Sequence, residues 1–145
     1  MVDVTTKSKT PRQASATGRV HTTPEVVAAI REGRVPKGDV LTTAQVAGVM
    51  AAKRTPDLLP LCHPIALGAV DVEFELGSDD VMITATVRAV DRTGVEMEAL
   101  TVVSVAALTV IDMVKAVDPA ASVENVMVTT KAGGKTGDWA RPAGR

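Results

Sequence analysis

The order of patterns along the 145 residues predicts an α+β fold: a ferredoxin-like, antiparallel four-stranded sheet with helices packed on one face. Two segments alternate apolar and polar residues, as half-buried strands do, and Gly77 to Asp80 joins them as a hairpin. Helical segments precede and follow this hairpin, which gives the order β-α-α-β-β-α-β. No internal repeat or linker is visible, so residues 1–145 are predicted to form a single domain.

The N-terminal third begins with a polar, irregular segment over residues 1–14, which predicts a flexible N-terminal arm. A first short strand is expected over residues 16–21. Thr23 followed by Pro24 predicts the start of a helix, because a hydroxyl caps the first turn and proline suits the first position. Gly33 is expected to end this helix.

The middle of the chain contains a second helix and the hairpin strands. A basic loop over residues 34–38 leads into a helix over about 39–53. Three prolines then predict an extended, stiffened connection over residues 55–64. The alternating strands of the hairpin occupy residues 70–76 and 81–88.

The C-terminal third contains the longest helix, predicted within the apolar segment 93–118. A last strand is expected over residues 123–130. The remaining residues, 132–145, are rich in glycine and polar side chains and predict a flexible C-terminal tail. The order of these elements completes the predicted α+β arrangement.

Composition excludes several classes of protein. The net charge of −1 argues against bulk attraction to nucleic acid or membranes, and only Phe74 and Trp139 are aromatic, which removes the stacking surfaces of single-strand-binding proteins. The single cysteine, Cys62, cannot form an internal disulfide and fits a reducing compartment. Asp3 interrupts any signal-peptide pattern, and the apolar stretch 102–110 is too short to span a bilayer. We therefore expect a cytoplasmic protein with no nucleic-acid or membrane partner.

The longest helix carries charged residues among its apolar ones. At about 100° per residue, Glu98, Asp112 and Lys115 lie within about a third of a turn of one another. Charge on the buried face of so apolar a helix is expected to have a partner or a function. Glu98 and Asp112 are about 21 Å apart along the axis, because fourteen steps rise about 1.5 Å each. Either the two ends serve different parts of a long ligand, or a second chain completes each site.

Asp112 and Lys115 are three residues apart, so an ordinary surface ion pair is the plain alternative to a catalytic pair. The apolar neighbours Leu108 and Ile111 favour partial burial, which would shift the pKa values of both charged groups. A lysine in such surroundings can act as a general acid or base.

The segment LCHP, residues 61–64, places Cys62 and His63 in a proline-stiffened loop. Such a loop can lie with its backbone against a ligand, although a lone histidine is more often a structural, hydrogen-bonded group. No metal site is expected, because His21 is the only other histidine and one cysteine gives no ligand set of recognised spacing.

Basic residues could serve a polyphosphate if the fold gathers them, although each alone is ordinarily a solvated charge. They are Arg12, Lys37, Lys53, Arg54, Lys115, Lys131 and Lys135. The segment AGGKTGD, residues 132–138, has the glycines of a phosphate-binding loop. Thr129 stands where the first glycine of a Walker motif is required and no helix has room to follow, so a Walker-type ATPase is excluded and a glycine-rich phosphate contact stays open.

Four motifs in this order closely resemble the cyclic pyranopterin monophosphate synthases, the MoaC family of molybdenum cofactor biosynthesis: LCHP, TGVEMEAL, a helix ending in DMVKAVD, and KAGGKTGDW. The similarity extends to MVDVTTKSKTPRQA and KGDVLTTAQVAGVMAAKRTPDLLPLCHP, so it covers nearly the whole chain. Ile111 and Val114 stand where relatives often have tyrosine and cysteine. These differences make the surroundings of the charged pair more apolar and remove no expected catalytic group.

The resemblance implies an enzyme, a lyase. It acts after a radical S-adenosylmethionine protein has converted GTP into 3′,8-cyclo-7,8-dihydro-GTP, and it rearranges this small-molecule intermediate into cyclic pyranopterin monophosphate with release of pyrophosphate. The steps are proton transfers and displacements, so no cofactor is required, and Mg²⁺ can accompany the triphosphate. The resemblance further implies a homohexamer, a trimer of dimers with sites between subunits.

Matched position by position, the resemblance implies three catalytic residues, Asp112, Lys115 and Lys37. It also implies substrate-binding roles at Leu61, Cys62, His63, Glu96, Met97, Glu98, Arg12, Lys53 and Lys135. In our hypothesis, Lys115 and Lys37 transfer protons, and Asp112 fixes the charge state or geometry of Lys115. Cationic side chains stabilise the departing pyrophosphate.

Three alternatives stay open. A ferredoxin-like module that binds nucleotides without chemistry would release no pyrophosphate. A scaffolding protein would use its apolar helix for oligomerisation alone, which leaves Glu98, Asp112, Lys115 and His63 without a shared purpose. An inactive relative would keep the motifs but not the activity.

Overall fold

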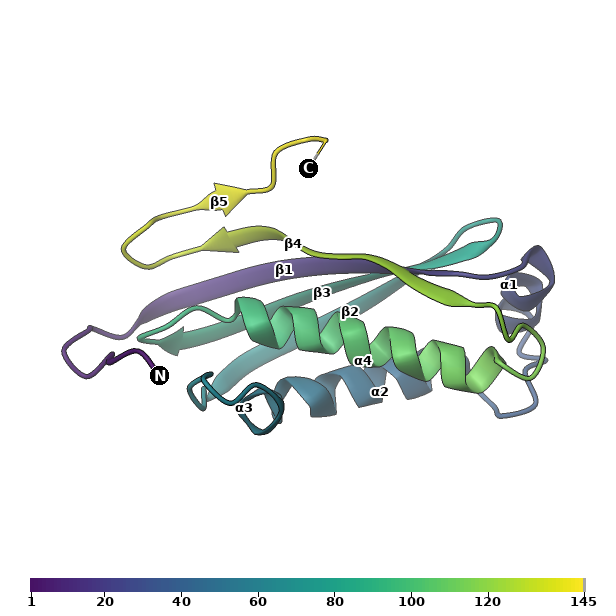
Figure 1. Ribbon diagram of the computed structural model, residues 1–145, viewed down its shortest axis with the longest axis horizontal. Helices are drawn as coiled ribbons and strands as arrows, with labels where there is room; N and C mark the ends of the chain where they lie inside the picture. The colour runs from purple at the N-terminus through teal and green to yellow at the C-terminus, as the bar shows by residue number, and fades with distance from the viewer. Residues whose placement is uncertain (145) are drawn as a thin grey trace.

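The computed structural model describes residues 1–144, in which five antiparallel strands form one open sheet in the order β2-β3-β1-β4-β5. The elements are β1 (Thr10–His21), α1 (Pro24–Arg31), α2 (Val40–Ala52), α3 (Thr55–Leu58), β2 (Leu67–Leu76), β3 (Asp80–Asp91), α4 (Glu96–Val114), β4 (Ser122–Ala132) and β5 (Trp139–Ala140). Helices α2 and α4 pack against each other on one face of the sheet (Figure 1). The four long strands therefore have the ferredoxin-like order, and the predicted fold class is confirmed.

The first strand is longer than predicted. It pairs with β3 from Thr10 to His21, whereas the sequence suggested residues 16–21 alone. Ala14 and Ala16 are fully buried, and polar residues alternate with them. Side chains this small give a weak apolar pattern, which explains why the strand was missed in the sequence. Residues 10–14 thus belong to the sheet and not to the predicted arm.

The sheet has a fifth strand that was not predicted, because part of the expected flexible tail pairs with β4. Two residues, Trp139–Ala140, form β5. Arg141 strengthens this pairing: its backbone N–H donates to the carbonyl of Thr129 (2.8 Å) and its Nε to that of Val128 (2.7 Å). Its guanidinium also lies 5.7 Å from the centre of the indole ring of Trp139. The last residue of the predicted tail, Arg145, lies outside the described residues.

The proline-rich connection is not extended throughout, because a short helix, α3, occupies Thr55–Leu58. Pro56 lies in the first turn, where a missing N–H costs nothing, so this proline starts a helix and does not prevent one. The buried hydroxyl of Thr55 donates to the carbonyl of Ala52 (3.1 Å), which fixes α3 against the end of α2. The LCHP loop then leads from α3 to β2.

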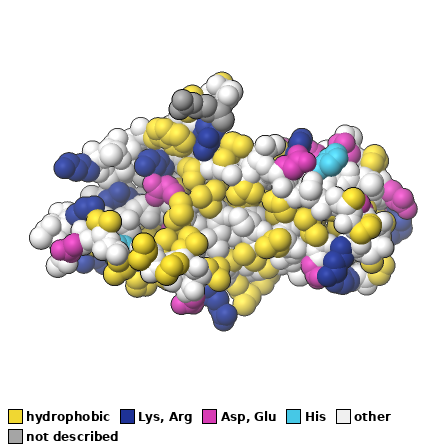
Figure 2. Space-filling view, viewed as in Figure 1, with side chains coloured by type: hydrophobic (Ala, Val, Ile, Leu, Met, Phe, Trp, Pro, Cys, Tyr) yellow, Lys and Arg dark blue, Asp and Glu magenta, His cyan; other side chains and the backbone are white. Residues whose placement is uncertain are grey.

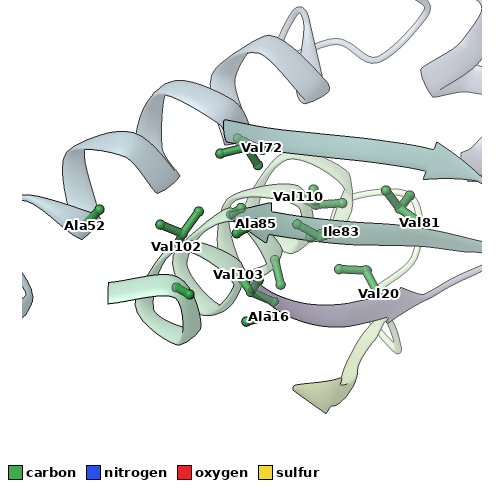
Figure 3. Close-up of a cluster of buried hydrophobic side chains, with 14 of the residues drawn as sticks. Ala16, Val20, Ala52, Val72, Val81, Ile83, Ala85, Val102, Val103 and Val110 are labelled. Carbon is green, nitrogen blue, oxygen red and sulfur yellow. The ribbon is translucent and has the colours of Figure 1, made fainter. Parts of the chain in front are cut away.

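The core is aliphatic, as the near absence of aromatic residues predicts. Side chains of the central strands, such as Val20 and Ile83, meet Val103 and other residues of α4 (Figure 3). Gly18 lets α4 approach the sheet closely, since a Cβ at this position would lie 2.6 Å from a methyl carbon of Val103. Gly48 likewise lets α2 approach α4. These contacts fix α4, and with it both ends of the helix, relative to the sheet.

Helix α4 has 19 residues and a mean hydropathy of 1.8, which by length and composition alone would suffice to span a membrane. The expectation from the sequence rested on the apolar stretch 102–110 alone, which is too short to span a bilayer. Half of this apolar segment is buried inside the fold, where it packs against the sheet and α2. Packing as the central helix of the core therefore accounts for its apolar character.

Candidate functional site

Apart from Lys53, the predicted site residues gather into two groups at opposite ends of α4. The first group lies at the end of the helix and contains Asp112, Lys115 and Lys37. The second surrounds the first turn and lines two clefts. Figure 2 shows Lys and Arg side chains at both ends of the elongated molecule. The axial distance of about 21 Å from Glu98 to Asp112 separates the two groups within one chain.

Two lysines hold the carboxylate of Asp112 from both sides. The Nζ of Lys115 donates to Oδ1 of Asp112 at 2.6 Å, and the Nζ of Lys37 donates to Oδ2 at 2.8 Å. Lys37 also donates to the backbone carbonyl of Asp112 at 2.8 Å. The three residues assigned to catalysis by resemblance therefore lie in direct contact, and we name them the lysine–aspartate cluster.

The local sequence Lys37-Gly38-Asp39 explains how Lys37 reaches α4. Gly38 has φ = +104°, a backbone conformation that glycine adopts without strain, so the chain turns sharply here. Asp39 then caps α2, since its carboxylate accepts the backbone N–H of Thr42 (3.0 Å). The turn and the cap fix the loop next to the C-terminal end of α4, where Lys37 meets Asp112.

The lysine–aspartate cluster is exposed, which corrects the expectation that Asp112 and Lys115 lie on a partly buried face. The exposed fraction of the Asp112 side chain is 56%, and that of Leu108 is 60%. Only Glu98, of the three charged positions, is buried. Val110, Met113 and Val114 at the same end of α4 are buried, so Asp112 and Lys115 lie on the outer face of the helix and not on its packed face.

The electrostatic consequence is a strongly acidic carboxyl group. Hydrogen bonds and charge from Lys115, then from Lys37, lower the pKa of Asp112 from 3.8 to about 2. Since the folded-state pKa is depressed, the stabilisation is present above the ordinary pKa and is lost as the pH falls towards 2. Asp112 is therefore an anion throughout the physiological range, and it is not the group that exchanges protons.

We predict that NMR titration will give Asp112 a pKa of about 2 in the native chain. Replacing both Lys37 and Lys115 by alanine should return this pKa towards 3.8, because the hydrogen bonds and positive charges that lower it are removed. Asp39 is a matched internal control, since its pKa is lowered by hydrogen bonds from Thr42 and should not move. An unchanged pKa of Asp112 in the double variant would contradict the assignment.

The first of the two clefts, which we name the α4 cleft, has a volume of about 340 Å³ beside the first turn of α4. It is lined by Leu61, Cys62, His63 and Ile65 of the LCHP loop, by Thr93, Gly94, Glu96, Met97 and Glu98, and by Val2, Val4 and Lys7 of the N-terminal arm. The fold thus brings together all six of the predicted substrate-binding residues of the LCHP and TGVEMEAL motifs.

Burial raises the pKa values of two groups in the α4 cleft. Glu98 is only 2% exposed, and loss of solvation raises the pKa of its carboxyl group. Burial, and secondarily the charge of Glu98, raises the pKa of the Cys62 thiol above 9.0. A raised pKa makes the reactive thiolate less abundant, which does not favour Cys62 as a nucleophile.

The second cleft, which we name the basic cleft, has a volume of about 500 Å³ and is lined by four cationic side chains. They are Lys7, Arg12, Arg92 and Lys135, and the other lining residues are Ser8, Thr10, Thr93, Gly94, Gly134 and Thr136. The two clefts adjoin, because they share Lys7, Thr93 and Gly94. A long anionic ligand can therefore extend from one into the other.

The basic cleft contains two predicted residues and two that the sequence analysis missed. Arg12 and Lys135 were predicted, and Lys7 and Arg92 were not. Arg92 directly precedes the TGVEMEAL motif, which is the one signal that could have identified it. Lys53, the C-terminal cap of α2, lines neither cleft and stays apart from both groups within one chain.

The glycine-rich segment after β4 forms a turn between β4 and β5, and no helix follows it within the described residues. The backbone N–H of Gly133 donates to Asp138 across this turn (3.2 Å). Lys131, at the end of β4, pairs with Glu96 at 3.2 Å. One cation of the segment, Lys135, lines the basic cleft, and the segment lacks the helix of a Walker motif.

The lysine–aspartate cluster is suited to acid–base catalysis, and the basic cleft is suited to binding an anion. Two ammonium groups share one carboxylate, and a separate set of cations lines a cleft. Among residues 1–144, no three His, Cys, Asp or Glu side chains are close enough together to hold a metal ion.

Comparison with known proteins identifies close relatives. A family model described as the MoaC family matches residues 1–134. Cyclic pyranopterin monophosphate synthase of Streptomyces griseus subsp. griseus is 61% identical over 143 residues, which cover 99% of this chain and 81% of the relative. Cyclic pyranopterin monophosphate synthase 2 of Mycobacterium tuberculosis is 60% identical, with coverages of 97% and 84%. The synthase of a Nocardioides species is 59% identical, with coverages of 98% and 89%.

Proposed function

The chain belongs to the MoaC family, and we propose that it converts 3′,8-cyclo-7,8-dihydro-GTP into cyclic pyranopterin monophosphate with release of pyrophosphate. This is an early step of molybdenum cofactor biosynthesis, catalysed by a lyase. The observation that carries the proposal is the contact of Lys37 and Lys115 with the carboxylate of Asp112. In this geometry the Asp112 carboxylate holds two exposed ammonium groups side by side, which suits proton transfer by the two lysines.

The three residues of the lysine–aspartate cluster have different roles in the proposed reaction. Asp112 stays anionic and fixes the positions of both ammonium groups. Lys115 uses one of its three N–H bonds on Asp112, which leaves two for a substrate, and Lys37 uses two and leaves one. We assign proton transfer to the two lysines, because ring opening and reclosure to a pterin need a proton donor and an acceptor.

The two clefts accommodate the rest of the substrate. The α4 cleft is partly apolar and lies beside His63 and Glu98, which suits a purine-derived ring. The basic cleft supplies cations for the triphosphate and for the departing pyrophosphate. Because the clefts adjoin, one elongated molecule can occupy both.

Replacing Arg12 by alanine is expected to weaken binding of the triphosphate substrate about tenfold to a hundredfold. A charge-assisted contact to phosphate contributes about 1.5–3 kcal/mol, and each 1.4 kcal/mol is about tenfold in affinity. The measurement is calorimetric affinity for a non-reacting GTP analogue and for the corresponding nucleoside. The variant should lose affinity for the triphosphate only. If the ratio of the two affinities stayed at the wild-type value, Arg12 would not contact phosphate.

We further propose a homohexamer, a trimer of dimers, in which a neighbouring chain brings its lysine–aspartate cluster to the clefts. The separation of about 21 Å along α4 supports this arrangement, because one chain cannot direct both groups at one reacting atom. Apolar side chains on the outer faces of the helices also support it. Val46 and Met50 of α2 and Leu108 of α4 are each more than half exposed.

The proposed enzyme works in the cytoplasm and requires no cofactor. The support for a soluble protein is that α4 packs as a core helix. The support for a cofactor-free reaction is its chemistry, since every step is a proton transfer or a displacement. Mg²⁺ enters this account only as a companion of the substrate triphosphate.

A coupled assay for pyrophosphate tests the function directly. The purified chain, given enzymatically prepared 3′,8-cyclo-7,8-dihydro-GTP, should release one pyrophosphate per cyclic product. A nucleotide-binding module would bind the same compound reversibly and release none. Tight binding without pyrophosphate would therefore refute the proposed activity and favour the binding module.

A further inference from the structure

The N-terminal arm forms part of the walls of both clefts. Val2 and Val4 line the α4 cleft, Ser8 lines the basic cleft, and Lys7 lines both. Within the arm, the hydrogen bonds are local. The N–H of Thr5 donates to Asp3 (2.8 Å), and the N–H of Lys7 donates to the carbonyl of Val4 (3.0 Å). These contacts give the arm its turn but do not attach it to the sheet or to α4.

Arg92 supplies the attachment. Its Nε donates to the backbone carbonyl of Lys7 at 3.0 Å, and among residues 1–144 this is the side-chain hydrogen bond that joins residues 1–9 to the rest of the chain. Arg92 directly follows the last residue of β3, Asp91, which pairs with Thr10 of β1. Its own carbonyl accepts a hydrogen bond from Nη2 of Arg12 (3.3 Å). Arg92 therefore links a predicted phosphate-binding arginine to the arm.

Two polar atoms in the basic cleft are buried without a partner. They are Oγ1 of Thr10 and Nε of Arg12, and both residues line this cleft next to Arg92. Polar atoms without a hydrogen bond are costly in a folded protein unless a ligand or water satisfies them. Nε of Arg19, outside both clefts, is a third such atom, so the two atoms show unused hydrogen-bonding capacity in the wall of the basic cleft and do not by themselves identify a ligand.

We propose that Arg92 is a positioning residue that holds the N-terminal arm closed over the two clefts, so that Lys7 adds a cation to the phosphate-binding set. This inference rests on the proposed function for the identity of the ligand, a triphosphate. Without the bond from Arg92, the arm is closed for a smaller fraction of the time. Part of the free energy of substrate binding is then used to close the arm. This raises KM and leaves kcat at saturation nearly unchanged.

The test compares Arg92→Ala, Arg92→Lys and a control, Arg31→Ala, whose side chain is exposed at the end of α1. Arg92→Ala should raise KM about tenfold, the value of one charge-assisted hydrogen bond, and change kcat by less than about twofold. Arg92→Lys should recover part of the loss, because it keeps a cationic donor, and Arg31→Ala should match the wild type. Loss of kcat at unchanged KM, or no change in either, would overturn the proposal.

Two readouts do not depend on turnover, so they separate failure of this inference from failure of the proposed function. Affinity for inorganic tripolyphosphate should fall about tenfold in Arg92→Ala, at an unchanged melting temperature. Tripolyphosphate should protect the wild-type arm from tryptic cleavage after Lys7 and should protect Arg92→Ala much less. Equal affinity and equal protection in the two proteins would refute the role of Arg92 even if the enzyme is a synthase.

A double-mutant cycle tests the link to Lys7. Lys7→Ala and Arg92→Ala should each lower affinity for tripolyphosphate, and the double variant should bind no more than about twofold more weakly than the worse of the two. This result is expected because the Lys7 side chain contributes only when Arg92 holds the arm. Fully additive losses would mean that the two cations act independently, and the positioning role would be wrong.

Discussion

Lys115→Ala is expected to lower kcat by about two to four orders of magnitude, the usual value of a general acid or base. Assembly and most of the substrate affinity should survive, because Lys115 is exposed and, within residues 1–144, forms an ion pair with Asp112 alone. The measurement is single-turnover formation of the cyclic product from the cyclised GTP intermediate, with circular dichroism and light scattering to check folding and assembly. Turnover at nearly the wild-type rate would remove Lys115 from the proposed mechanism.

Two further variants separate proton transfer by Lys115 from its positive charge. Lys115→Arg keeps the charge and can still pair with Asp112, but a guanidinium does not give up its proton in proteins. We therefore expect Lys115→Arg to be nearly as inactive as Lys115→Ala. Lys9→Ala is the matched control, since Lys9 is exposed and lines neither cleft. Full activity of Lys115→Arg would indicate electrostatic stabilisation in place of acid–base catalysis.

Much of the fold could be predicted because capping and alternation are local properties. Thr23 and Asp39 accept hydrogen bonds from the first turns of α1 and α2, where the sequence placed the starts of these helices. The hairpin of β2 and β3 followed from strict alternation. The early start of β1 and the short strand β5 could not be predicted, because small side chains and two-residue pairings leave almost no local pattern.

Part of the candidate site could likewise be predicted from the sequence, and part could not. Asp112 and Lys115 are neighbours on one helix, so their contact was predictable from spacing. Lys37 comes from a loop 75 residues earlier, and the resemblance alone suggested its role. Exposure of Asp112 was predicted wrongly, because its apolar neighbour Leu108 suggested a buried face, whereas Leu108 is itself exposed and the packed face carries Val110 and Val114. The bond from Arg92 to the carbonyl of Lys7 depends on tertiary structure and has no pattern in the sequence.

The central claim is that each active site combines the clefts of one chain with the lysine–aspartate cluster of another. Two variants damage these parts separately: His63→Ala alters the α4 cleft, and Lys115→Ala alters the cluster. If sites form between chains, a mixed oligomer contains some sites whose two parts are both intact. With random mixing this fraction is about one quarter of all sites, since each part is intact in about half of the chains.

Complementation between these two variants, each of which is expected to have low activity alone, is the most direct measurement of this claim. Co-expressed His63→Ala and Lys115→Ala chains, purified as the mixed oligomer, should recover up to about a quarter of wild-type activity. Lys37→Ala mixed with Lys115→Ala is the negative control, because both changes damage the cluster and no site can be intact. Recovery in the first mixture and none in the second is the predicted result. A first mixture no more active than its two components would contradict the claim.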